Sequence, residues 1–274
     1  MKQALSPREP RRLTVLVLRL RPLAESDLMV DLFSRELGRL SALAKGGKRS
    51  QKRFFGLLLA GHHLEATLLP GRQGGIWLLE GARLTDNHLG LRQDFRRLML
   101  ASPVLELLMR ATALHDPHPK ALDLALLTLS RLERGAEPVE MASALVIFLT
   151  RLLEELGYGL GLESCLHCGQ PLDRIARPRL SLTGGLTCAD CPPAPRDRGA
   201  PPGLIKSLHS ALAMEPPTLG RLKLSPSLLR PALGFLADFW RHMVGHDLPS
   251  LALAMKQCPP PSAPFRSRCK LLPH

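Results

Sequence analysis

The sequence predicts an α+β fold in which a small β-barrel is followed by a helical domain. A change of pattern along the chain predicts this order. Up to about residue 84, short apolar runs alternate with turns that contain Gly or Pro, which is typical of a barrel. Beyond residue 88, apolar residues recur every three or four positions, which is typical of helices that bury one face. At 274 residues, the chain is long enough for two domains of roughly 150 residues each.

Five strands are expected in the first part of the chain. The third alternates most clearly, with Leu40, Ala42 and Ala44 on one face. Gly38 is free to adopt a positive φ, so a hairpin turn is expected before this strand. Five short strands in this length favour an OB-fold, a small barrel that often binds nucleic acid. The expected strands are residues 13–20, 28–34, 39–45, 54–60 and 75–80.

The helical part contains two strong predictions, residues 138–156 and 226–244. Each begins with a proline that suits the first turn and is followed by a glycine that suits the end. Their apolar stripes are interpreted as core rather than as grooves for a partner. Shorter helices are expected between the prolines and glycines of this part, at residues 90–100, 103–114, 120–133 and 204–213.

Four cysteines form two Cys-x-x-Cys pairs, Cys165 with Cys168 and Cys188 with Cys191. Nineteen residues separate the pairs, which is within the range for a four-thiolate zinc site. Two intervening residues let one tight turn aim both sulfurs at the same point, and zinc binds four soft ligands in a tetrahedron. The alternative is two disulfides or four unrelated thiols, which a reducing compartment disfavours. We expect one structural Zn²⁺ per chain, because four protein ligands leave no position for water or substrate.

The predicted fold class is therefore α+β, with an N-terminal five-stranded OB-fold barrel and an α-helical domain that carries an inserted four-cysteine zinc ribbon. The expected barrel domain covers residues 1–84. The helical domain covers residues 85–255, with the zinc module at 162–192. A basic tail at 256–274 is expected to be mobile, and its Cys258 and Cys269 to be free thiols.

The charge of the chain predicts a polyanionic partner. The formal net charge is +13 and the pI is about 10.2. A compositional bias of the genome would also raise the Arg content. No charge-free apolar run approaches the length of a membrane span, and the first twelve residues are too charged and too broken by proline for a signal peptide. We expect a cytoplasmic, nucleoid-associated protein with no membrane partner.

The basic residues are concentrated in the expected barrel, where residues 1–84 hold fifteen Lys or Arg and seven Asp or Glu. The densest run is residues 45–53, with five cations, two glycines and no acid. Such a loop would follow phosphates without reading bases, and the alternative is a solvated loop that only aids solubility. The predicted DNA-binding residues are Lys45, Lys48, Arg49, Lys52 and Arg53, with Arg35 and Arg39 as an extension of the same surface. Three nearby aromatics, which could stack on bases or belong to the core, are Phe33, Phe54 and Phe55.

No catalytic constellation is visible in the sequence. Gly47-Lys48 resembles the end of a phosphate-binding P-loop, but Ala42 stands where that motif needs Gly and Arg49 stands where it needs Ser or Thr. The pair His62-His63 lacks the spacing of a zinc peptidase. We expect no enzymatic activity. The remaining enzymatic alternative, a hydrolase with an unrecognised site, would lack an open metal position.

Several short segments resemble a known family. Arg21-Pro22, Glu25-Ser26-Asp27, Gly38-Arg39-Leu40 and the run from Ala44 to Ser50 resemble the N-terminal signature of the bacterial recombination mediator family RecO. Leu156-Gly157-Tyr158-Gly159, just before Cys165, resembles the second recognisable stretch of that family. The segments occur in the family's order and span most of residues 13–191.

This resemblance implies a non-catalytic function in DNA repair and recombination. It implies binding of single- and double-stranded DNA, annealing of complementary strands and, with RecR and RecF, loading of RecA onto DNA coated by single-stranded-DNA-binding protein. Matching positions for DNA contact are Arg39, Lys45, Lys48 and Arg49, and then Arg35, Lys52 and Arg53. Some family members lack the cysteines, which implies that zinc is not required for the activity that the family shares. Its implied role here is to fix the ribbon onto the helical domain. The alternative function is a zinc-ribbon scaffold that binds nucleic acid in transcription or RNA metabolism.

Overall fold

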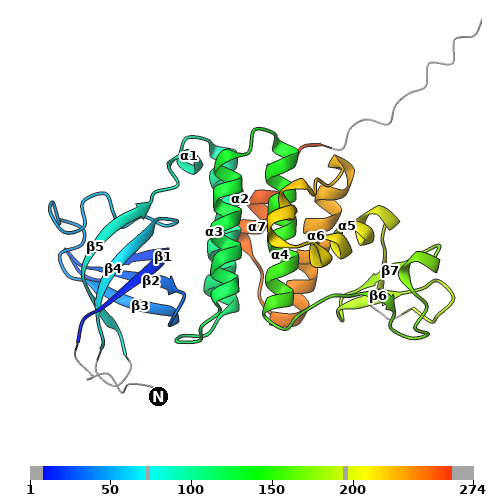
Figure 1. Ribbon diagram of the computed structural model, residues 1–274, viewed down its shortest axis with the longest axis horizontal. Helices are drawn as coiled ribbons and strands as arrows, with labels where there is room; N and C mark the ends of the chain where they lie inside the picture. Colours follow the sequence, from blue (N-terminus) through cyan, green and yellow to red (C-terminus); the bar gives the residue numbers. More distant parts are fainter. Residues whose placement is uncertain (1–8, 72–74, 194–196, 261–274) are drawn as a thin grey trace, which may run out of the picture.

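The computed structural model describes residues 9–71, 75–193 and 197–260. Its N-terminal part is a closed five-stranded barrel, seen in blue and cyan in Figure 1, with strand order β1-β2-β3-β5-β4. Neighbouring strands are antiparallel except β3 and β5, which pair in parallel. The predicted OB-fold is therefore confirmed. The strands are β1 (Arg11–Pro22), β2 (Leu28–Ser34), β3 (Gly38–Ala44), β4 (His63–Leu69) and β5 (Trp77–Asp86).

The barrel interior is filled by every second residue of its strands. In β3, Leu40, Ala42 and Ala44 point inward and are fully buried, as the alternation predicts. The equivalent positions in β4 are Leu64, Ala66 and Leu68, also buried.

The strand expected at residues 54–60 was wrong. These residues form turns, and the fourth strand begins at His63. The chain reverses direction at Gly56, whose φ is 69°, so the segment cannot stay extended. Phe54 and Leu58 are nevertheless buried in the barrel core, which explains why the segment is apolar without being a strand.

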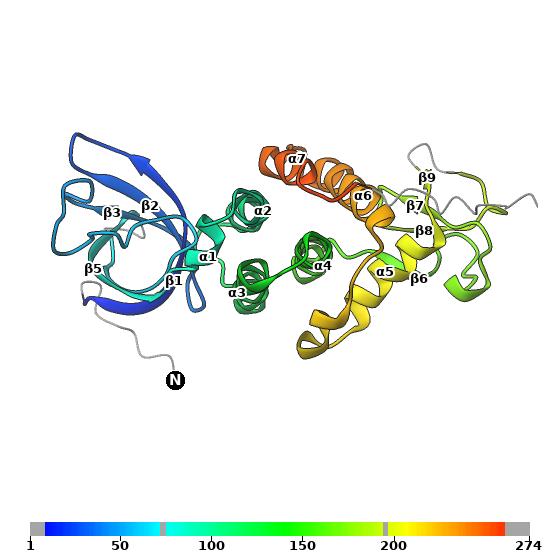
Figure 2. The same ribbon diagram turned by 90° about the horizontal axis from the view of Figure 1, so that it is seen from above.

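The second part of the chain is helical. Its elements are α1 (Leu89–Arg92), α2 (Phe95–Ala111), α3 (Pro119–Arg134), α4 (Pro138–Glu155), α5 (Pro202–Ala213), α6 (Pro226–Val244) and α7 (Pro249–Met255), with short 3₁₀ helices at η2 (Leu172–Arg174) and η3 (Pro216–Arg221). Helix α4 lies between α3 and α6 in both views (Figures 1 and 2), and its residues 141–150 are all buried. A helix that is buried all round is the centre of this core.

The helix boundary expected at Pro103 was also wrong, because α2 continues through that residue. A proline inside a helix removes one backbone hydrogen bond and normally bends or ends the helix. Here Pro103 is buried, and α2 is capped at its start by Asp94, whose carboxylate accepts from the N–H groups of Arg96 and Arg97. Tertiary packing therefore outweighs the local preference of the proline.

A small sheet follows α4 at the end of the molecule far from the barrel (Figure 2). Its strands are β6 (Gly161–Cys165), β7 (Arg179–Ser181), β8 (Gly185–Thr187) and β9 (Asp197–Gly199), in the order β6-β8-β7-β9. This sheet carries the four paired cysteines, so the inserted ribbon predicted by their spacing is present in the fold.

The barrel and the helices share a packed boundary. Leu16, Leu18 and Phe33 point outward from the barrel and join the buried core of the helical part. At Gly38 the backbone has a φ of 64°, and an added Cβ would lie 1.9 Å from the carbonyl oxygen of Asp116. Gly38 therefore serves both the predicted turn and the close approach of the two parts.

The residues that follow α7 include Cys258, which belongs to the buried core together with Leu251 and Ala254 of that helix. Cys258 is buried, and burial raises the pKa of its thiol to about 11. Residues 261–274, including Cys269 and most of the expected mobile tail, lie outside the described residues. Within the described ranges, no helix combines the length and the apolar character needed to cross a bilayer.

Candidate nucleic-acid interface and metal centre

Two loops meet at one end of the barrel: the connection from β1 to β2 and a basic loop, residues 45–55, that follows β3. The Gly46 N–H donates to the Asp27 carboxylate at 2.8 Å, and the Lys48 N–H donates to the carbonyl of Ser26 at 2.9 Å. The Asp27 carboxylate thus braces the basic loop. Two segments that are separated along the chain by the β2–β3 hairpin are hydrogen-bonded to each other in space.

The basic loop is also braced internally. Arg53 donates from its guanidinium to the carbonyl of Lys45 at 2.8 Å. The Ser50 hydroxyl accepts from the N–H groups of Arg53 and Phe54, each at 3.1 Å. These hydrogen bonds fix the backbone of the basic loop near both of its ends. The charged side chains therefore project from a backbone of defined conformation.

The structure brings five of the predicted DNA-binding residues together on this loop, and all five are exposed. The one acid paired with them in the described part of the chain is Glu25, whose carboxylate lies 3.9 Å from Arg49; both side chains are largely in water, so this pair neutralises little charge. The loop therefore presents a concentrated positive surface. Its members are Lys45, Lys48, Arg49, Lys52 and Arg53.

Arg35 and Arg39 lie elsewhere, at the opposite end of the β2–β3 hairpin. Arg35 forms an ion pair with Asp123 of α3, and Arg39 donates from Nε to the carbonyl of Thr112 at 3.1 Å. The strand from Arg39 to the start of the basic loop spans about 20 Å. The two arginines therefore do not extend the surface of the basic loop as expected, and their contact with DNA stays a prediction.

Sequence reasoning missed a second basic cluster on the outer face of β1. Arg19 Nε lies 2.9 Å and Arg21 3.3 Å from the buried carboxylate of Asp31, which also accepts from the Ser41 hydroxyl at 2.7 Å. Burial raises the pKa of Asp31, but the hydrogen bonds from Ser41 and Arg19 and the two positive charges outweigh it, so the pKa lies below its usual value. The i, i+2 spacing of the two arginines in a strand was the available signal, since it places both on one face.

Replacing Asp31 by Asn is expected to lower the free energy of unfolding at pH 7 by about 1–3 kcal/mol, because a buried partner of two cations is lost. The folded-state pKa of Asp31 is depressed, so its contribution is present above the unfolded pKa of about 3.9 and is lost as the pH falls through the folded pKa. Urea unfolding of both proteins should therefore show a gap at pH 7 that closes below about pH 4.

The matched control is Asp123→Asn, which removes an ion pair between two half-exposed side chains. Its cost should stay below about 1 kcal/mol. A gap between wild type and Asp31→Asn that is the same at pH 3 and pH 7 would contradict the assigned protonation.

The four paired cysteines converge in the ribbon. The sulfurs of Cys165 and Cys191 lie 3.9 Å apart, those of Cys168 and Cys188 lie 3.7 Å apart, and all four lie within 4.8 Å of one another. A tetrahedron with metal–sulfur bonds of about 2.3 Å has sulfur–sulfur edges of about 3.8 Å, whereas a disulfide needs about 2.0 Å. The cluster can therefore hold one metal ion, and its edges fit zinc.

The electrostatics of the cluster also fit a cation. Burial raises the pKa of Cys165, but backbone N–H groups, including those of Cys168 and Cys188, lower it to about 6. The hydrogen bond with the sulfur of Cys188 and burial raise the pKa of Cys191 to about 12. Cys165 thus loses its proton readily, whereas deprotonation of Cys191 is unfavourable beside the other sulfurs. A bound cation would stabilise both thiolates. His167 is exposed.

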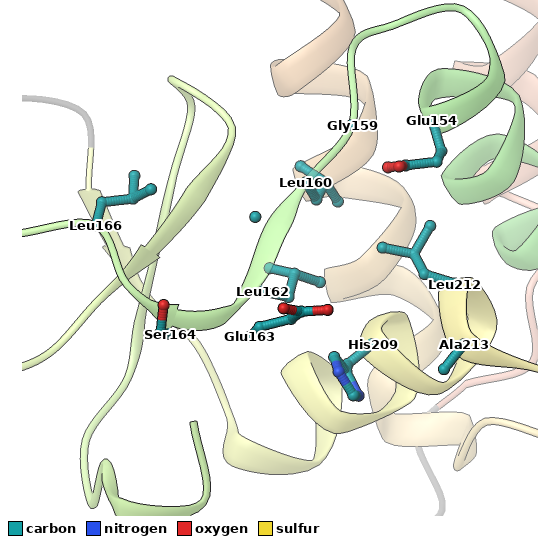
Figure 3. Close-up of a pocket in the computed structure, with 11 residues that line it drawn as sticks. Glu154, Gly159, Leu160, Leu162, Glu163, Ser164, Leu166, His209, Leu212 and Ala213 are labelled. Carbon is teal, nitrogen blue, oxygen red and sulfur yellow. The ribbon is translucent and has the colours of Figure 1, made fainter. Parts of the chain in front are cut away.

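A pocket of about 570 Å³ opens between β6, the end of α4 and α5 (Figure 3). Two of its lining residues, Ser164 and Leu166, flank Cys165 of the cysteine cluster. Glu154 of α4, Glu163 of β6 and His209 of α5 line it (Figure 3). Two carboxylates would repel a phosphate backbone. The pocket is therefore no extension of the positive surface of the basic loop.

The chain matches two family models that together cover most of it. One, described as Recombination protein O N terminal, matches residues 11–88, and the other, Recombination protein O C terminal, matches residues 92–252. The DNA repair protein RecO of Anaeromyxobacter sp. (strain Fw109-5) is 32% identical over 246 residues, which cover 86% of this chain and 92% of that protein. The DNA repair protein RecO of Geobacter metallireducens is 33% identical over 183 residues, which cover 67% of this chain and 73% of that protein. The DNA repair protein RecO of Syntrophus aciditrophicus is 27% identical over 232 residues, which cover 83% of this chain and 88% of that protein.

Proposed function

This chain belongs to the RecO family, and from that premise we propose that it is a non-catalytic mediator of DNA repair and homologous recombination that binds DNA through the basic loop of its barrel. The family supports the role in DNA repair. The observation that carries the binding mode is the braced backbone of residues 45–55, from which five exposed cations project. Lys and Arg in such an arrangement bind phosphates, and therefore both single and double strands.

Annealing follows from the same charges. Two complementary strands repel each other through their phosphates, and a surface that neutralises several phosphates at once lowers that repulsion. The loop would contact backbone and leave base edges free to pair. We assign annealing to the barrel domain. We propose that the cysteine cluster binds a structural Zn²⁺, which holds the ribbon on the helical domain.

The wider role that we propose requires protein partners. With RecR and RecF, the chain would help to load RecA onto single-stranded DNA coated by single-stranded-DNA-binding protein. This work would take place in the cytoplasm, at the nucleoid.

The test is an annealing assay with two complementary oligonucleotides, naked or coated with single-stranded-DNA-binding protein, with and without RecR. The chain is expected to accelerate annealing of naked strands, to bind both DNA forms and to need RecR for full activity on coated strands. Its affinity should fall linearly on a log–log plot against salt, because each neutralised phosphate releases counterions.

Parallel titration with RNA of the same sequence separates this proposal from a scaffold in RNA metabolism. Tight RNA binding without DNA annealing would favour the scaffold. Absence of binding to either DNA form at low salt would refute the proposal.

A further inference from the structure

Phe55 differs from every other aromatic side chain in the described part of the barrel. Phe33 is fully buried, and Phe54 and Trp77 are 3% and 6% exposed, whereas Phe55 is 75% exposed. Leaving a Phe ring in water forgoes the stabilisation that burial would give. Single exposed apolar residues are common, so exposure alone assigns no role. The position of this ring within the basic loop supplies the argument.

The loop geometry makes Phe55 point outward. Its neighbour Phe54 enters the barrel core, and the guanidinium of Arg53 covers the Phe54 ring at 5.1 Å from its centroid. After Phe55 the chain turns at Gly56, with a φ of 69°, and a Cβ added at Gly56 would find no atom within 4 Å. Phe55 therefore follows a residue, Phe54, that is anchored in the core, and its own ring lies in solvent. The ring lies beside the open space at Gly56 and follows the cations at positions 52 and 53 in the chain.

We infer that Phe55 is a stacking site for one unpaired nucleobase, and that it gives the basic loop a preference for single-stranded over double-stranded DNA. This inference rests on the proposed DNA binding and adds the strand selectivity. The cations attract the phosphates of either form, but only an unpaired base offers its face to a ring. The open space beside Gly56 is where such a base would lie, while Arg53 or Lys52 holds its phosphate.

The test compares Phe55→Ala and Phe55→Trp with wild type, using oligothymidylate and a blunt duplex at one salt concentration. Stacking on an aromatic side chain corresponds to about a 5- to 150-fold change in affinity per base. Phe55→Ala should lose that much affinity for oligothymidylate and less than about twofold for the duplex. Phe55→Trp should retain the affinity, and its exposed indole should be quenched by oligothymidylate, since Trp77 and Trp240 are buried.

Leu59→Ala is the matched control, because Leu59 is an exposed apolar side chain that follows the same loop at 44% exposure. It should leave both affinities unchanged, and unchanged thermal unfolding of all variants confirms that the fold is intact. Equal losses for both DNA forms in Phe55→Ala, or no loss for the single strand, would overturn the inference. So would a loss of RecR binding in place of DNA binding, which would make the ring a protein contact.

A variant that lacks the five cations of the loop separates this inference from the proposed function. If that variant loses both DNA forms while Phe55→Ala changes neither, the proposed function stands and the stacking site fails. If the five-cation variant binds both forms as wild type does, the proposed binding surface itself is wrong.

Discussion

Replacing Lys45, Lys48, Arg49, Lys52 and Arg53 together by Ala is expected to reduce the affinity for DNA on the order of 10³-fold near 0.15 M salt, if each cation neutralises one phosphate. The slope of log affinity against log salt should fall by about 4–5 for duplex and by about 3–4 for single strands. All five side chains are exposed, so the barrel should keep its fold, but the substitution also removes the hydrogen bond from Arg53 to the Lys45 carbonyl that braces the loop. Fluorescence anisotropy at several salt concentrations measures both quantities, and annealing should fall with affinity.

The matched control removes five exposed cations from the helical part, at Lys120, Lys206, Arg221, Arg230 and Lys256. It changes the net charge equally, so any difference between the two variants reports position. The control should lose much less affinity than the loop variant. Equal losses would mean that the chain binds DNA through its overall charge, and the basic loop would have no special role.

Removal of the proposed Zn²⁺ is expected to unfold the ribbon and to destabilise the helical domain, while the barrel keeps its fold. Isolated structural zinc sites contribute about 10–16 kcal/mol, which is comparable to the whole stability of a domain, about 5–15 kcal/mol. Loss of zinc should cost less free energy than this here, because the surrounding helices already hold part of the ribbon in place. Cys165 and Cys188 belong to the same buried core as α4 and α6. A Cys165→Ser, Cys188→Ser variant should contain no zinc by elemental analysis and unfold at a lower temperature.

Wild type purified under reducing conditions should contain about one zinc per chain. Cys258→Ala is the control, since Cys258 is buried at α7 away from the cluster and should leave the zinc content unchanged. The barrel has a separate core, so the zinc-free variant should still bind DNA under conditions in which it remains soluble. A wild type without metal would refute the site, and loss of DNA binding on chelation alone would show that the ribbon takes part in it.

Local features of the fold were predictable from the sequence. The cysteine cluster required only two tight turns and a spacing, both of which are sequence-local. The hairpin at Gly38 and the strand after it followed from one glycine and a clear alternation. In contrast, the run at 54–60 contains apolar residues because Phe54 and Leu58 pack into the barrel core from a turn. The alternation of Leu64, Ala66 and Leu68 belongs to the strand that follows. A buried Pro103 within α2 could not be foreseen, because only packing against neighbouring helices decides whether a proline ends a helix.

By itself, the sequence determined the composition of the basic loop, the cysteine cluster and the order of barrel and helices, because these depend on neighbouring residues. Only the tertiary structure decided which charges and rings share a surface. It placed Arg35 and Arg39 against the helices and the other five cations at the far end of the hairpin. It also buried Phe33 and Phe54 and left Phe55 in water. The physical reason is that the cations of residues 45–53 and the pair Phe54-Phe55 lie in a loop, which has no regular alternation of faces, so the packing around the loop determines which side chains are covered.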